Sequence, residues 1–256
     1  MKFYILFAFH LICSFNIQAA DSTWLNIEPI STDRPDQTES PSTLPFKFFQ
    51  MEIGMNIESE EKELQFVHPT ILWRVGIFKS TELRLTTDVI SFKDNTQRYK
   101  VGLSPIGIGF KTAICEERKA RPAIAFIGNM EIPYLSTKNV RTTYFAPSFK
   151  FAFEHSLPKN ISLGYNGGME WDGYSPHPTF IYTLVNGFSV KEKWYLYYEF
   201  FGGFPIKEKS THSFDVGVAY GIKTICNLIY QVVCNYIHLQ KHGMPHLDIH
   251  FAFLTK

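Results

Sequence analysis

Strict alternation of apolar and polar side chains is the feature that most restricts how this chain can fold. From residue 49 to residue 58, every second residue is apolar, and each residue between them is polar or glycine. The apolar residues are Phe49, Met51, Ile53, Met55 and Ile57. Successive side chains of a β-strand point to opposite faces, so this period of two predicts a strand with one apolar and one polar face.

Comparable stretches recur to the end of the chain, and they number about twelve. They cover residues 49–58, 64–77, 81–91, 98–112, 122–131, 143–154, 159–172, 178–190, 193–203, 213–223, 226–237 and 246–254. The fourth stretch changes parity at Pro105, where a β-bulge would restore the apolar face. A single-chain bacterial outer-membrane barrel requires an even number of antiparallel strands, which a count of twelve satisfies.

Charged residues occupy the polar face of most predicted strands. Arg or Lys facing lipid at the bilayer midplane costs about 2–4 kcal/mol, so these side chains are expected to line an interior. The predicted lumen-lining residues are Glu52, Arg74, Arg84, Asp88, Lys100, Lys150, Glu170 and Asp215. A soluble β-sandwich or a lipocalin-like barrel is the structural alternative, but a small sandwich has little use for so many charges opposite its core. We therefore expect an all-β fold, an antiparallel transmembrane β-barrel of about twelve strands with an extended N-terminal segment.

Composition agrees with a membrane barrel. Mean hydropathy is −0.09, a value typical of soluble proteins, although the chain contains 24 Phe and 13 Tyr. A barrel reconciles the two facts, because apolar side chains face lipid, polar ones face the lumen, and aromatic residues gather at both membrane interfaces. The formal net charge of +1 provides no basic field, so we expect no nucleic-acid partner.

The first 20 residues read as an export signal. Lys2 supplies the charge, residues 3–15 supply an apolar run too short to span a bilayer, and Ala19 and Ala20 offer a cleavage site. Export through such a signal is expected to lead to the outer membrane of a Gram-negative bacterium. The predicted organisation is a signal peptide at 1–20, an extended N-terminal arm at 21–45 and the barrel at 46–256.

A polar, proline-broken decapeptide, TDRPDQTESP, spans residues 32–41 within the arm. Each proline disfavours helix in the residue before it, so the segment is expected to be extended. Its charged residues are Asp33, Arg34, Asp36 and Glu39. Because the predicted wall offers both signs of charge, these residues could enter the lumen and pair with it as a plug or gate. The alternative is a periplasmic tail whose charges are solvated.

The decapeptide, followed by FQMEIGMNIE and then by PTILWRVGIFKSTELRL, resembles bacterial outer-membrane transporters of the family named for a MetA pathway of phenol degradation. Three later segments resemble that family as well: GLSPIGIGFK at 102–111, WYLYYEFFG at 194–202 and SFDVGVAYGI at 213–222. The resemblance covers essentially the whole mature chain. It implies a barrel in the outer membrane and passage of small aromatic or hydrophobic compounds.

Two other groups of residues suggest chemistry that we do not expect. The histidines His238, His242, His246 and His250 recur every four residues and would stack on one helix face as a metal site, but Gly243 and Pro245 forbid that helix. We therefore assign no metal and no cofactor. His212 and Ser213 invite comparison with barrel-embedded lipid hydrolases, yet neighbouring strand residues point to opposite faces and no third residue completes a triad.

We expect passive translocation of a small solute, without enzymatic activity. A twelve-stranded barrel falls between filled eight-stranded barrels and open sixteen-stranded porins, so its pore is expected to be narrow or closed at rest. The expected partners are outer-membrane lipid, a small-molecule solute and the outer-membrane assembly machinery, since the last predicted strand resembles the alternating aromatic end that serves as an assembly signal. The alternatives are a membrane-embedded lipid-modifying enzyme and a non-conducting structural or surface barrel.

Overall fold

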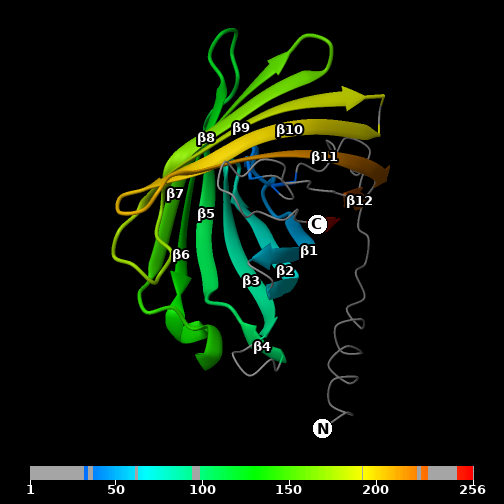
Figure 1. The fold of residues 1–256 in the computed structure, drawn as a ribbon. Coiled ribbons are helices and arrows are strands. Elements are labelled where there is room, and N and C mark those ends of the chain that lie inside the picture. The colour runs from blue at the N-terminus through cyan, green and yellow to red at the C-terminus, as the bar shows by residue number, and fades with distance from the viewer. Residues whose placement is uncertain are drawn as a thin grey trace.

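The structure is a computed structural model, and it describes residues 32–33, 37–60, 63–93, 99–191, 193–223, 226–229 and 247–255. The described chain consists mainly of β-strands, which Figure 1 shows as a strongly curved sheet. The strands are β1 (Phe49–Glu60), β2 (Glu63–Phe78), β3 (Thr81–Lys93), β4 (Tyr99–Leu103), β5 (Ile106–Cys115), β6 (Ala123–Ile132), β7 (Ala146–Leu157), β8 (Ile161–Glu170), β9 (Thr179–Val190), β10 (Trp194–Pro205), β11 (Thr211–Lys223), β12 (Cys226–Ile229) and β13 (Leu247–Thr255). Two short 3-10 helices, η2 (Pro133–Leu135) and η3 (Lys138–Val140), follow β6. No helix in the described ranges is long and apolar enough to cross a bilayer.

All strand pairs are antiparallel and belong to one sheet. The hydrogen-bonded order is β2-β1-β13-β12-β11-β10-β9-β8-β7-β6-β5-β3-β4, and β2 pairs in addition with β3. Most neighbours are also consecutive in the chain, as expected for an up-and-down meander built from hairpins. The expected all-β, antiparallel class is confirmed.

The predicted bulge near Pro105 is present as a break between β4 and β5, which both pair with β3. Leu103 of β4 lies opposite Val89, and Gly107 of β5 lies opposite Thr86. Four steps along β4 and β5 therefore face three steps along β3, so one extra residue is accommodated. That extra residue restores the side-chain parity that the sequence appeared to lose.

Predicted and observed strands overlap wherever the structure describes them, and the differences lie at their ends. The stretch predicted from residue 143 begins as a strand only at Ala146, because Thr143 and Tyr144 donate backbone hydrogen bonds to the carbonyl of Gly173 instead of to a neighbouring strand. The stretch predicted from Lys159 begins only at Ile161, because its first residues form a turn with positive φ. Residues 230–246, which include the end of the eleventh predicted strand, lie outside the described residues.

The sheet has a polar inner face and an apolar outer face. Along β10, Leu196, Tyr198 and Phe200 are 42%, 38% and 46% exposed, whereas Glu199 between them is fully buried. The largest fully buried side chains among the described residues are likewise polar: Gln50, Glu52, Arg74, Glu82, Lys111, Glu199 and Asp215. Charged side chains are rarely buried to this degree in water-soluble proteins unless they are paired. The arrangement reverses the apolar core expected of the soluble sandwich.

Candidate functional site

The arm turns inward immediately before β1. Lys47 has a φ of 68°, and the turn is held by hydrogen bonds from Lys47 N to Gly76 O at 2.9 Å and from Gly76 N to Phe48 O at 2.9 Å. A Cβ at position 76 would overlap the carbonyl oxygen of Pro45, so glycine is required for this close approach. Leu44 N then donates to Glu82 Oε2 at 2.7 Å, which directs the preceding residues along the polar inner face.

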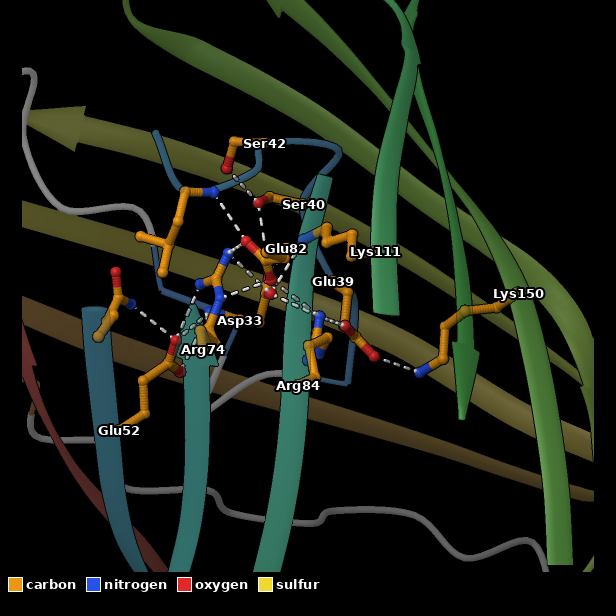
Figure 2. Close-up of polar contacts among 12 residues, drawn as sticks. Asp33, Glu39, Ser40, Ser42, Glu52, Arg74, Glu82, Arg84, Lys111 and Lys150 are labelled. Atoms are coloured by element: carbon orange, nitrogen blue, oxygen red, sulfur yellow. Dashed lines mark hydrogen bonds and ion pairs between the residues drawn. The ribbon is translucent and has the colours of Figure 1, made fainter. Parts of the chain in front are cut away.

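Asp33 is the centre of the contacts between the arm and the wall. Its carboxylate is completely buried and lies 2.9 Å from Arg84 Nη1 and 3.3 Å from Arg74 Nη2. Lys111 Nζ donates to both of its oxygens, at 2.7 and 2.9 Å. Figure 2 shows these side chains converging on Asp33 from β2, β3 and β5. Three cations from three strands therefore surround one arm carboxylate.

Glu39 forms a second bridge, farther along the sheet. Its carboxylate lies 2.6 Å from Arg84 Nη1 and 2.9 Å from Lys150 Nζ on β7 (Figure 2). Its backbone is bound as well: Glu39 N donates to Asn166 Oδ1 at 2.7 Å, and Asn166 Nδ2 donates to Glu39 O at 2.9 Å. This pair of hydrogen bonds fixes the arm to β8 by its main chain.

The residues between these two carboxylates reach the far side of the interior. Gln37 N donates to Glu199 Oε2 at 2.8 Å, and the Thr38 hydroxyl donates to the other oxygen of Glu199 on β10. The same oxygen lies 2.7 Å from Thr183 Oγ1 on β9 and accepts a hydrogen bond there, because its single proton goes to Glu199. Together with the contacts to β1, β2, β3, β5, β7 and β8, the described arm residues bond to eight strands.

The wall has a salt-bridge network of its own around Arg74. The guanidinium donates from Nε and Nη2 to the two oxygens of Glu82, at 2.8 and 2.9 Å, and from Nη1 to Glu52 Oε1 at 2.9 Å. Gln50 Nε2 donates to the same Glu52 oxygen at 2.7 Å. Asp33 N completes the network by donating to Glu52 Oε2 at 3.2 Å. Such bidentate, charge-assisted bonds fix the orientation of both partners.

Burial and charge act in opposite directions on the arm carboxylates. Burial alone would raise the pKa of Asp33, but Arg74, Lys111 and Arg84 hold it well below its ordinary value. Burial would likewise raise the pKa of Glu39, yet Arg84 and Lys150 lower it to about 2. Both arm carboxylates are therefore ionised at neutral pH.

Only some of the residues proposed for the gate and the lumen lining come together in the structure. Asp33, Glu39, Glu52, Arg74, Arg84 and Lys150 meet in the contacts described above, whereas Arg34 and Asp36 lie outside the described residues. Asp215 is buried on the inner face. Asp88 is half-buried and accepts a hydrogen bond from Ile71 N at 3.2 Å, while Lys100 and Glu170 are exposed near strand ends.

Several arm-binding residues were missing from the predicted lining. They are Glu82, Lys111, Asn166, Thr183 and Glu199. Parity had already placed Glu82 and Asn166 on the polar face of their strands. A parity signal also existed for Lys111, which follows the outward-facing Phe110, and for Glu199, which lies between the outward-facing Tyr198 and Phe200. If the alternation of apolar and polar residues is continued past Pro105, Lys111 falls on the polar face of its strand.

The alternative chemistries find limited support in the described residues. His212 Nδ1 lies 2.8 Å from the hydroxyl of Tyr182, and its imidazole packs edge-on against Phe204 at 5.4 Å. The described contacts include none between His212 and Ser213. Three members of the histidine series lie outside the described residues: His238, His242 and His246. The fourth, His250, lies in β13.

Comparison with known proteins identifies the family of this chain. Residues 32–225 match the family described as "Putative MetA-pathway of phenol degradation". The chain belongs to this family. The match begins at Thr32, so it includes the decapeptide that contacts the wall, and the resemblance inferred from the sequence is confirmed.

One solved structure with a similar fold is an outer membrane channel. The crystal structure of the COG4313 outer membrane channel from Pseudomonas putida F1 aligns with a TM-score of 0.64 at 10% identity, over 88% of this chain and 100% of that one. OmpT, an outer membrane protein of Vibrio cholerae, aligns with a TM-score of only 0.35 at 9% identity, over 82% and 97% of the two chains, which is too low to indicate a shared fold. Among curated proteins, none matches the chain by sequence.

Proposed function

We propose that the protein is an outer-membrane channel whose N-terminal arm occludes the lumen at rest and is displaced when a small solute passes. The observation that carries this proposal is the set of arm contacts, in which Asp33, Gln37, Thr38 and Glu39 bond to strands on opposite sides of the interior. A tail solvated below the barrel would make no such contacts. Family membership and the fold shared with a COG4313 outer membrane channel support the same function.

The barrel in this proposal has twelve strands, with β4 and β5 forming two halves of one strand. The support is the pairing of β3 with both halves, together with the pairing of β2 with β3, which returns the strand order on itself. Exposed aromatic and aliphatic side chains on the outer face would contact lipid. Residues 1–20 would direct export, and the last strand would be read by the assembly machinery.

Passage would be passive, without cofactor or covalent chemistry. A solute would enter the lumen, meet charged and amide side chains, and leave once the arm had moved. The family description suggests small aromatic or hydrophobic compounds as solutes.

Liposome swelling tests the proposal. Three proteins are compared: the wild type, a deletion of residues 32–41, and a variant in which those ten residues are replaced by a Gly/Ser sequence of equal length. Phenols, aromatic acids and sugars serve as solutes. We expect slow swelling with the wild type and at least tenfold faster swelling with both variants.

The replacement variant separates loss of specific contacts from loss of chain length. Equal, rapid swelling with all three proteins would show that the arm does not occlude the pore. No swelling with any of them, for protein that migrates as a folded barrel in unheated gels, would favour the non-conducting structural barrel.

A further inference from the structure

The wall around Asp33 has the features of a binding site for an anion. Arg74 of β2 lies directly opposite Arg84 of β3 in the strand register, and like charges in that position repel each other. Lys111 of β5 adds a third cation, which is fully buried. A buried group of three cations needs an anion among them. Asp33 supplies it.

The arm provides two of the four carboxylates that the cations of this part of the wall contact. The described ion pairs of Lys111 are with Asp33, and that of Lys150 is with Glu39. Without the arm, the carboxylate closest to Arg84 among the described residues would be Glu82, at 3.8 Å. Arg74, in contrast, would keep its short bonds to Glu52 and Glu82.

Charge counting gives the same result. Among the groups in direct ion-pair contact, this part of the wall contributes four cations, Arg74, Arg84, Lys111 and Lys150, and two carboxylates, Glu52 and Glu82, which leaves an excess of two positive charges. The two arm carboxylates neutralise that excess. Three further wall carboxylates, Glu154, Glu170 and Glu199, act on Lys111 or Lys150 from beyond ion-pair distance. Displacing the arm would therefore leave these four cations with only two carboxylates in direct contact, both of them on Arg74.

We propose that this wall site binds small organic carboxylates, and that Asp33 and Glu39 occupy it in the resting protein as built-in competitors. The inference rests on the proposed function, because it requires the arm to leave. In this account Lys111 and Arg84 bind the first carboxylate, Arg84 and Lys150 bind a second, and Arg74 positions the first (Figure 2).

The geometry favours solutes with two carboxylates close together. Asp33 Oδ2 and Glu39 Oε2 lie 2.9 Å and 2.6 Å from the same Arg84 nitrogen, so these two oxygens can be at most about 5.5 Å apart. A compact dicarboxylate such as succinate or phthalate can satisfy both positions. Terephthalate, whose carboxylates point in opposite directions, and the neutral succinamide should fit poorly.

The test uses a double variant, Asp33→Asn with Glu39→Gln, in which both arm carboxylates are replaced by neutral amides. Both the binding of small carboxylates and the channel current are measured. By calorimetry, succinate and phthalate should bind this variant at least tenfold more tightly than the wild type, and at least tenfold more tightly than terephthalate or succinamide. Adding Lys111→Met or Arg84→Gln should reverse the gain. Lys79→Gln, which removes an exposed lysine in the turn between β2 and β3, should change nothing.

Planar-bilayer recordings provide the second readout. In a salt gradient, the reversal potential of the neutralised variant should shift toward anion selectivity, and succinate should block the current at lower concentration than succinamide. Equal effects of succinate and succinamide, or equal effects of Lys111→Met and Lys79→Gln, would overturn the inference while leaving the channel intact. If no variant conducts, the proposed channel function fails, and calorimetry alone still decides whether the carboxylate site exists.

Discussion

Asp33 accepts hydrogen bonds from Lys111 Nζ through both of its carboxylate oxygens, at 2.7 and 2.9 Å, although the two residues are 78 positions apart in the chain. Both side chains are completely inaccessible to solvent. This contact connects the arm to the middle of β5, so mutations at Lys111 can test the position of the arm.

Replacing Lys111 by Met should weaken arm docking strongly. Breaking a buried ion pair by removing one partner typically costs about 3–5 kcal/mol, because the remaining charge is left without compensation. Arg74 and Arg84 still face Asp33, so the lower end of that range is expected. Hydrogen exchange of the Gln37 and Glu39 amides measures the docking free energy, with Lys79→Met as the control. Unchanged exchange in Lys111→Met would contradict the assigned contact.

Gly76→Ala should displace the arm without breaking the sheet. A Cβ at this position collides with the main-chain carbonyl of Pro45, which cannot move while the turn before β1 is intact. The matched control is Gly167→Ala in β8, since a Cβ there has nothing within 4 Å. We expect faster proteolysis of the arm in Gly76→Ala and wild-type behaviour in Gly167→Ala. Equal protection of the arm in the two variants would show that the turn tolerates the side chain.

A charged residue introduced on the outer face of the sheet should lower the free energy of unfolding. Phe200 is 46% exposed on β10, and Arg in its place would face lipid at a cost of about 2–4 kcal/mol if it lies near the midplane. Phe200→Leu, which keeps an apolar side chain, is the control. The measurement is the free energy of folding into phospholipid vesicles by urea titration. An Arg variant as stable as the Leu variant would place this face away from lipid.

Glu39 should stop stabilising the docked arm only at low pH, where its carboxylate becomes protonated. The pKa of Glu39 in the docked arm is about 2, below the ordinary 4.5. Glu39 therefore stabilises arm docking fully above about pH 4.5, and this stabilisation is lost as pH falls toward 2. The difference in arm protection between the wild type and Glu39→Gln isolates this group from other carboxylates. That difference should be constant from pH 8 to pH 5 and should vanish near pH 2. A difference that disappears by pH 6 would refute the pairing with Arg84 and Lys150.

Local patterning was sufficient to predict the strands, because a period of two is visible in any window of ten residues. It also placed Glu52, Arg74 and Arg84 on the polar face, where the structure has them buried. The starts of β7 and β8 were missed because turns and loop hydrogen bonds, which depend on distant residues, end the alternation early.

The contacts between particular arm residues and particular wall residues could not be predicted in the same way. The decapeptide offers three acidic residues of similar chemistry, and nothing in its sequence says that Asp33 is the one that reaches Lys111. Glu199 and Thr183 bind the arm from β10 and β9, across the interior from Glu52, and no spacing in the sequence relates these positions. Sequence reasoning therefore identified the kinds of group involved, while the three-dimensional path selected among them.

Locking the arm tests the central claim most directly. Thr38 and Thr183 lie at hydrogen-bond distance, 2.7 Å between their hydroxyl oxygens, so a Thr38→Cys, Thr183→Cys double variant can tether the arm to β9 through a disulfide. Single-channel recordings are made before and after addition of a reductant. The Thr38→Cys and Thr183→Cys single variants, which keep the native cysteines, are the controls. We predict no openings in the oxidised double variant and openings that begin on reduction. Identical openings in both states would contradict a channel closed by its arm.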